Sequence, residues 1–280
     1  MEKKKNVKWN TLRVMAAGFF GVILLGGVLL WLPVSNAQPV LFLDALFTSV
    51  SAVCVTGLVT ITPISQFTLF GKVILLLLIQ IGGLGVIACA TIFFFLLRRK
   101  ITLRERVVLQ EAYGADHLGG IVAFVKKVIL GTLAVEGVGA VLYAFRFIPE
   151  YGIIRGIWYS VFHAVSAFCN AGIDILGENS LADYMTDPLV NFTTMFLIIS
   201  SGIGFVVWFD LLSNGQKIFR RKSRGRWWFN GLKLQSKLAL IMTAVLLAAG
   251  TVFVFLAEYG NPDTIGNLTL GQKVMASAFQ

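Results

Sequence analysis

Long apolar runs alternate with short polar or basic segments along the chain. Crossing the hydrocarbon core of a bilayer as a helix takes about 20 predominantly apolar residues. Runs long enough to do so occupy residues 14–32, 68–97, 122–147, 188–212 and 238–258. The pattern predicts five membrane-spanning helices. The second run is over-long, so its helix should tilt or protrude from the membrane.

Two further apolar segments, residues 40–53 and 151–168, lie between predicted spans and are each followed by a short stretch that ends in glycine. A helix of about a dozen apolar residues is too short to cross the membrane. We therefore expect both to be re-entrant helices that end at mid-membrane. Backbone that leaves a helix at that depth must be buried in protein or line a water-filled path.

The two re-entrant segments resemble each other. Residues 47–58 align without a gap on residues 162–173, and Phe, Val, Ser-Ala, Cys and Gly recur at matching places. Downstream, residues 81–86 are echoed by residues 200–205. Two matched blocks in the same order indicate an internal repeat. The repeat predicts an all-α membrane protein built from units of span, pore helix, filter segment and span around a central ion pore.

The predicted organisation follows from these units. Phe279-Gln280 stands where Phe47-Thr48 and Phe162-His163 stand earlier, so we expect two complete units, the start of a third, and a sequence that is a piece of a longer protein. The predicted parts are a cytoplasmic leader (1–13), a first pore unit (14–97), a cytoplasmic linker (98–121), a second pore unit (122–212), a basic cytoplasmic loop (213–237) and the start of a third pore unit (238–280).

Composition agrees with a membrane protein. Hydrophobic residues make up 57% of the chain and charged residues only 14%, against about a quarter in soluble domains. The net charge of +10 comes from basic residues gathered in the segments between spans. That distribution predicts a cytoplasmic N-terminus in the plasma membrane and argues against nucleic acid as a partner. Three cysteines do not form a disulfide framework.

The chemistry that such a unit supports is cation coordination by backbone carbonyls. A re-entrant helix aims the negative end of its dipole at mid-membrane, and an extended segment after it can direct carbonyl oxygens at an ion path. Gly57 and Gly172 suit this backbone. A lone Thr-Gly would be read as a turn under a short packing helix, but its recurrence in the same context favours a filter.

Several other residues keep two interpretations each. Ser51 and Ser166 either cap carbonyls behind the filter or simply pack. A set of glycines either allows close helix packing or clears room for the filter: Gly82, Gly83, Gly85, Gly202 and Gly204. Glu136, an ionisable group inside a span, is either functional or paired structurally with a Lys or Arg.

Four blocks together resemble the Trk/Ktr/HKT superfamily of potassium transporters, most of all its KtrB- and TrkH-type membrane subunits: SAVCVTGL, SAFCNAGI, IQIGGLG and ITLRERVVLQEAYG. The resemblance covers nearly the whole chain. It implies a first filter segment of Cys54, Val55, Thr56 and Gly57 and a second of Cys169, Asn170, Ala171 and Gly172. A glycine at the first position goes with potassium in this family and a serine with sodium preference.

The resemblance also implies partners. Family members form homodimers, one pore per protomer, on a cytosolic ring of nucleotide-binding regulatory subunits. The basic segments at residues 98–106 and 217–237 would contact that ring or anionic membrane lipid. Potassium is the implied transported ion, sodium a candidate coupling ion, and no covalently bound cofactor is expected.

Two alternatives to potassium uptake stay open. One is a sodium-permeable or poorly selective transporter of the same family, and the other is an inactive fragment of the pore subunit. A membrane-embedded enzyme is disfavoured, because the sequence offers no intramembrane His pair, paired carboxylates or nucleophile with a neighbouring base.

Overall fold

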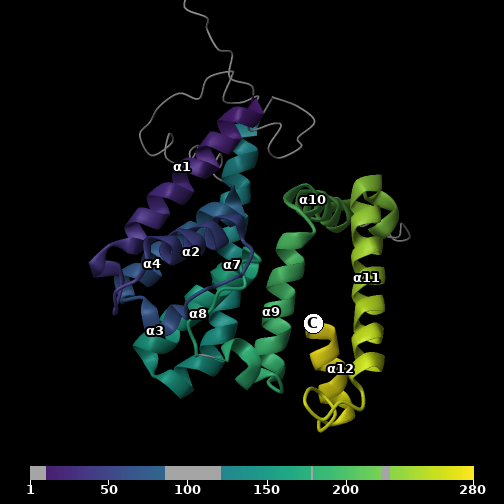
Figure 1. Ribbon diagram of the computed structural model, residues 1–280. Helices are drawn as coiled ribbons and strands as arrows, with labels where there is room; N and C mark the ends of the chain where they lie inside the picture. The colour runs from purple at the N-terminus through teal and green to yellow at the C-terminus, as the bar shows by residue number, and fades with distance from the viewer. Residues whose placement is uncertain (1–10, 86–120, 178, 222–227) are drawn as a thin grey trace, which may run out of the picture. The chain divides into compact units, whose positions relative to one another are not determined.

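The computed structural model describes residues 11–85, 121–177, 179–221 and 228–280, and all its regular structure is helical. The longer helices are α1 (Thr11–Trp31), α2 (Phe42–Cys54), α4 (Leu69–Leu84), α7 (Ile121–Tyr151), α8 (Ile153–Phe168), α9 (Pro188–Gly202), α10 (Phe205–Arg221), α11 (Leu234–Glu258) and α12 (Leu270–Phe279). Short helical segments are η1 (Pro33–Ser35), α3 (Pro63–Gln66), η2 (Ser180–Tyr184) and η3 (Trp228–Gly231). The predicted all-α membrane protein is confirmed as a fold class (Figure 1).

The described chain forms two compact units. Of the described residues, the first contains 11–85, 121–137 and 161–177, and the second contains 138–160, 179–221 and 228–280. Both predicted filter segments belong to the first unit. The leader up to residue 10, residues 86–120 with most of the predicted cytoplasmic linker, and part of the basic loop at 222–227 lie outside the described residues.

Small residues bring α1 against α2 in the first unit, where the two helices pack together with α4. A Cβ on Gly26 would lie 2.5 Å from Ser49 Oγ, and one on Gly27 would lie 2.9 Å from a methyl carbon of Leu46. The Ser49 hydroxyl donates to the carbonyl of Ile23 in α1 at 2.8 Å. Such close approach is typical of helix pairs within membranes, and it fixes the position of the helix that precedes the first filter segment.

The predicted span at 188–212 is broken, so its prediction as one continuous helix was wrong. The helix within the predicted span at 68–97 ends before Gly85, and residues 86–97 lie outside the described residues. Helix α4 ends at Leu84, and Gly85 has φ +87°. The predicted span at 188–212 is divided into α9 and α10, which are bent by 97°, and Gly204 at the break has φ +86°. The physical reason is the positive φ of these two aligned glycines, which takes the backbone out of the helical region.

The bend between α9 and α10 carries its own hydrogen bond. The indole Nε1 of Trp208 donates to the carbonyl of Ser200 at 2.6 Å. Carbonyls near the end of a helix have no partner within it, so a side-chain donor at this point supplies one. The break in the second unit is therefore stabilised by two residues: Gly204 supplies the positive φ angle and Trp208 supplies the hydrogen bond.

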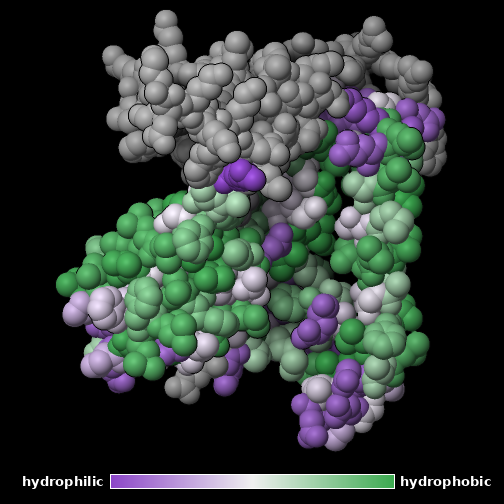
Figure 2. Space-filling model, turned by 45° about the horizontal axis from the view of Figure 1, so that its top comes forward, coloured by the Kyte–Doolittle hydropathy of each residue, from purple (hydrophilic) through white to green (hydrophobic). Residues whose placement is uncertain are grey.

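Many of the exposed side chains on the described helices are large and hydrophobic. Among the described residues, α7 from Ala123 and α11 are long and apolar enough to cross a membrane, and α9 with α10 counts as a third span if the bent pair is taken together. None of the most apolar window of α11 is buried. Figure 2 shows hydrophobic residues over α11 along most of its length, with hydrophilic residues at its two ends. The surface is that of a membrane protein.

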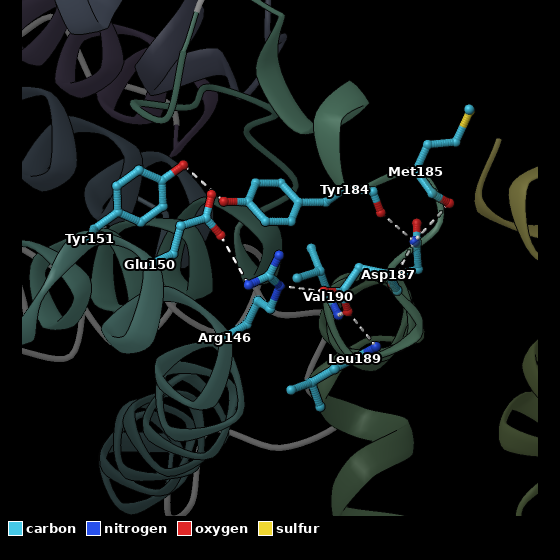
Figure 3. Close-up of polar contacts among 9 residues, drawn as sticks. Arg146, Glu150, Tyr151, Tyr184, Met185, Asp187, Leu189 and Val190 are labelled. Atoms are coloured by element: carbon cyan, nitrogen blue, oxygen red, sulfur yellow. Dashed lines mark hydrogen bonds and ion pairs between the residues drawn. The ribbon is translucent and has the colours of Figure 1, made fainter.

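In the second unit an ion-pair network joins the end of α7 to the start of α9 (Figure 3). Arg146 donates from Nε to Asp187 at 2.6 Å and lies 3.1 Å from the Glu150 carboxylate one turn further along α7. The other oxygen of Asp187 accepts from the backbone N–H groups of Leu189 and Val190, at 2.9 and 3.2 Å. Asp187 is therefore both the N-cap of α9 and the partner of a guanidinium.

Aromatic and amide groups complete this network. The hydroxyls of Tyr151 and Tyr184 share a hydrogen bond of 2.8 Å, and Asn191 donates to the Tyr184 carbonyl at 2.8 Å (Figure 3). Burial raises the pKa of the Tyr184 phenol, so the neutral donor form persists through ordinary pH. The loop before α9 is thereby held to α7 through the Tyr184 side chain and to α9 through the Tyr184 backbone carbonyl.

Candidate functional site

The two predicted filter segments begin with the same backbone turn. Helix α2 ends at Cys54 and α8 at Phe168. The residues that follow, Val55 with φ +55° and Asn170 with φ +57°, both adopt the left-handed conformation. A left-handed residue just past the last turn is a common way to end a helix. The turn directs both chains out of their helices in the same manner.

The same hydrogen bond closes each turn. Thr56 N–H donates to the Ser51 carbonyl at 3.0 Å, and Ala171 N–H donates to the Ser166 carbonyl at 2.8 Å. Both bonds join residues five apart, as in a Schellman motif. The repeat read from the sequence thus recurs in hydrogen bonding and in backbone angles at matching positions.

Gly57 and Gly172 bring the two segments together. Their φ angles are +74° and +66°. A Cβ on Gly57 would lie 2.9 Å from the Ala171 carbonyl oxygen and 3.5 Å from the Cα of Gly172. A Cβ on Gly172 would lie 3.6 Å from the Cα of Gly57. Two segments more than 100 residues apart therefore touch at their glycines.

The two serines answer one of the open questions. Ser166 donates its hydroxyl to the carbonyl of Ile173, directly after the second segment, at 2.5 Å. The Ser51 hydroxyl accepts from the Thr56 hydroxyl at 3.0 Å. Ser166 thus caps a carbonyl, whereas Ser51 holds a side chain of the first segment. Each hydroxyl ties the segment to the helix that precedes it.

Two glycines of α4 make room for these turns. A Cβ on Gly82 would overlap the Val53 carbonyl oxygen, and one on Gly83 would overlap the sulfur of Cys169. These two glycines therefore allow α4 to approach the ends of α2 and α8 closely, and whether they also clear room for a filter stays a prediction. Gly85, Gly202 and Gly204 have no described atom within 4 Å of their Cβ direction.

Side-chain exposure differs between the two segments. Cys54 is exposed, while Cys169, at the matching position, is buried with 7% of its surface accessible. Asn170 and Gly172 are exposed and Ala171 is buried. The Cys169 side chain therefore points away from solvent, toward α4 and α7.

Glu136 of α7 lies beside the second segment. Among the described residues its hydrogen-bond partners are the Gln80 side chain of α4, which donates to it at 3.0 Å, and the Cys169 thiol, which approaches the same oxygen at 4.0 Å. Sequence reasoning selected Glu136 but passed over Gln80. The signal was present, because Gln80 is an amide within an otherwise apolar run next to the glycines.

The arrangement offers neutral oxygen ligands. No group of three or more His, Cys, Asp or Glu that could hold a metal ion occurs in the described part of the chain. What converges instead are the carboxyl ends of two short helices and the backbone that follows them. Helix ends of this polarity and backbone carbonyl oxygens attract cations without binding them irreversibly.

Exchanging the residues at positions 55 and 170, which hold the left-handed conformation in the two segments, tests the backbone turn. Asn adopts this conformation at a lower energetic cost than the β-branched Val, which pays that cost at position 55. We expect Asn170→Val to cost about 1–2 kcal/mol and Val55→Asn to be neutral or mildly stabilising. The measurement is the thermal unfolding midpoint of the purified protein in potassium buffer. A variant Asn170→Val as stable as its parent would contradict the turn.

Comparison with known proteins places the chain beside cation transporters. The TrkH family model, described as a cation transport protein, matches residues 9–280. The Ktr system potassium uptake protein B of Bacillus subtilis is 41% identical, with 100% of this chain and 61% of the relative covered. The potassium/sodium uptake protein NtpJ of Enterococcus hirae is 38% identical, with 92% and 55% covered.

A third relative, the Ktr system potassium uptake protein B of Vibrio alginolyticus, is 37% identical over 99% of this chain and 59% of its own length. The chain therefore spans between 55% and 61% of the length of these relatives. The relatives are named for ion uptake, and no enzyme is among these three.

Proposed function

Because the chain belongs to the TrkH family of cation transport proteins, we propose that it contributes two filter segments to a potassium uptake pathway across the cell membrane. The segments are Cys54–Gly57 and Cys169–Gly172, and their backbone carbonyls replace water around a dehydrated potassium ion. The observation that carries the proposal is the contact between Gly57 and the Ala171–Gly172 backbone, just beyond the ends of two short apolar helices.

The matched geometry supports a common ion path. Equal turns at Val55 and Asn170 orient both segments alike relative to their helices. In a pathway built from such units the remaining carbonyls come from further units of the same kind. Two segments cannot surround an ion alone, so transport is expected of an assembly with more of them.

The experiment uses the complete gene product in cells that lack their own potassium uptake. We expect it to restore growth at low external potassium and to take up rubidium in competition with potassium. Empty vector is the control, and the amount of protein in the membrane is measured in parallel. Absence of both growth and rubidium uptake, with the protein present in the membrane, would overturn the proposal.

A second candidate is combined potassium and sodium transport. The name of the Enterococcus hirae relative, potassium/sodium uptake protein, favours it. Uptake of sodium in the absence of potassium, measured in the same cells, separates the two. A sodium rate close to the potassium rate would replace selective potassium uptake by this second candidate. An inactive fragment is tested by the 280-residue chain in liposomes, where potassium-selective flux would exclude it.

The assembly is part of the same proposal. We infer a homodimer with a cytosolic nucleotide-binding regulatory ring, a cytoplasmic N-terminus, and anionic lipid against the basic segments. The Ktr system names of two relatives support a regulatory partner in general terms. The mass of the purified complex, measured with and without the regulatory subunit, tests the homodimer and the binding of the regulatory ring.

A further inference from the structure

Glu136 is a buried acidic side chain that the carbonyl pathway does not use. It lies within α7, and only 5% of its surface is accessible. An ionisable group inside a membrane-spanning segment is costly to keep there, and it persists where it performs a task. Its neighbours indicate that task.

One oxygen of Glu136 collects two donors from two other helices. Oε1 accepts from Gln80 Nε2 of α4 at 3.0 Å and from the Cys169 thiol, at the end of α8, at 4.0 Å. The carboxyl group therefore joins three elements of the first unit at one atom. A junction of this kind fixes the relative position of the elements that it bonds.

Cys169 is the place where the second filter segment begins. It is the first residue after α8, and its N–H still donates to the Val165 carbonyl at 2.8 Å. Its sulfur is pressed against Gly83, where a Cβ would overlap it. The Cys169 side chain therefore has little room to move between α4 and α7 at the start of the second segment.

Within the described part of the chain, the first segment has no matching contact to a carboxylate. Cys54, at the matching position, is exposed. The two segments thus share a backbone turn but differ in the side chains that contact them, so loss of the Glu136 contact acts first on the second segment.

We propose, resting on the function proposed above, that Glu136 is a positioning residue for ion selectivity, which holds the second filter segment in register through Cys169. Its role is that of a hydrogen-bond acceptor from Gln80 and from the Cys169 thiol. A carboxamide oxygen at the same place can accept both bonds, whereas alanine can accept neither. The negative charge itself is not required.

The first test compares Glu136→Ala with Glu136→Gln in the complete gene product. In Glu136→Ala the preference for rubidium over sodium should fall about tenfold, since one segment loses the hydrogen bonds that fix it. In Glu136→Gln the preference should stay near that of the parent protein. Thr132→Val is the matched control, because Thr132 lies one turn earlier in α7 and is equally buried.

The second test measures the accessibility of the Cys169 thiol and does not depend on a transport assay. In a background of Cys54→Ser and Cys89→Ser, Cys169 is the remaining cysteine of this chain. We expect its thiol to resist a membrane-permeant maleimide in the parent and in Glu136→Gln, and to react in Glu136→Ala. Circular dichroism of each variant separates local release from general unfolding.

The outcomes separate the inference from the function. Unchanged ion preference and an unreactive Cys169 in Glu136→Ala would overturn the positioning role. Equal loss of preference in Glu136→Gln and Glu136→Ala would also overturn it, because charge would then be the agent. Failure of the parent protein to transport would refute the proposed function instead, while thiol labelling still reports on Glu136.

Discussion

Replacing Gly57 with serine should lower the preference for potassium over sodium by about tenfold or more. Two costs act together at this position. The φ angle of +74° costs a residue with a Cβ about 1–2 kcal/mol. The Cβ would also meet the Ala171 carbonyl oxygen at 2.9 Å, so the second segment must move as well. Competition of sodium against rubidium uptake measures the effect in the complete gene product.

Gly21→Ser is the control for this change. Gly21 lies in α1, and no described atom is within 4 Å of the position of its Cβ. We expect transport and ion preference of the control to match the parent protein. A Gly57→Ser variant that keeps its potassium preference, while present in the membrane at normal level, would remove Gly57 from the ion pathway.

Gly82→Val should abolish most transport. A Cβ at Gly82 would overlap the Val53 carbonyl oxygen and lie 2.9 Å from that of Ala52. Both are backbone atoms of the last turn of α2, which cannot rotate away as a side chain can. Either the end of α2 or helix α4 must shift, and overpacking of this kind costs about 1–3 kcal/mol. We expect rubidium uptake per molecule to fall by about tenfold or more.

Gly250→Val provides the comparison for Gly82→Val. Gly250 lies in α11, and no described atom stands within 4 Å of where its Cβ would be. Uptake should be normal in this variant. If Gly82→Val transported at the parent rate, the tight contact between α4 and the end of α2 would not matter for the pathway.

The repeat was readable from the sequence because it depends on residues with special backbone angles. Gly57 and Gly172 match in the sequence and have nearly equal φ angles. Glycine is visible in a sequence, and its freedom at positive φ is intrinsic. The all-helical membrane fold was predictable for a similar reason, since apolar runs of sufficient length have few other solutions in lipid.

The break in the predicted span at 188–212 was not predictable from hydropathy alone. Hydropathy continues through Gly85 and Gly204, yet the backbone leaves the helix at both. Single glycines are tolerated within membrane helices, so the break depends on tertiary contacts such as the bond from Trp208 to the Ser200 carbonyl. Local pattern cannot supply that information.

The different surroundings of Cys54 and Cys169 were also beyond the sequence. The two cysteines occupy equivalent places in the repeat, but one is exposed and the other is buried beside Glu136. Cys169 contacts both Gly83 of α4 and Glu136 of α7. Pairing across helices that are distant in the sequence has no local signature.

The central claim is that the two segments offer their backbone oxygens to one ion. The most direct measurement is a structure of the complete gene product with thallium in place of potassium, in which anomalous scattering locates the ion. We predict a thallium peak bordered by backbone oxygens of both the Val55–Gly57 and the Asn170–Gly172 stretches. Ions that bind only elsewhere, with these oxygens turned toward protein or lipid, would contradict the account.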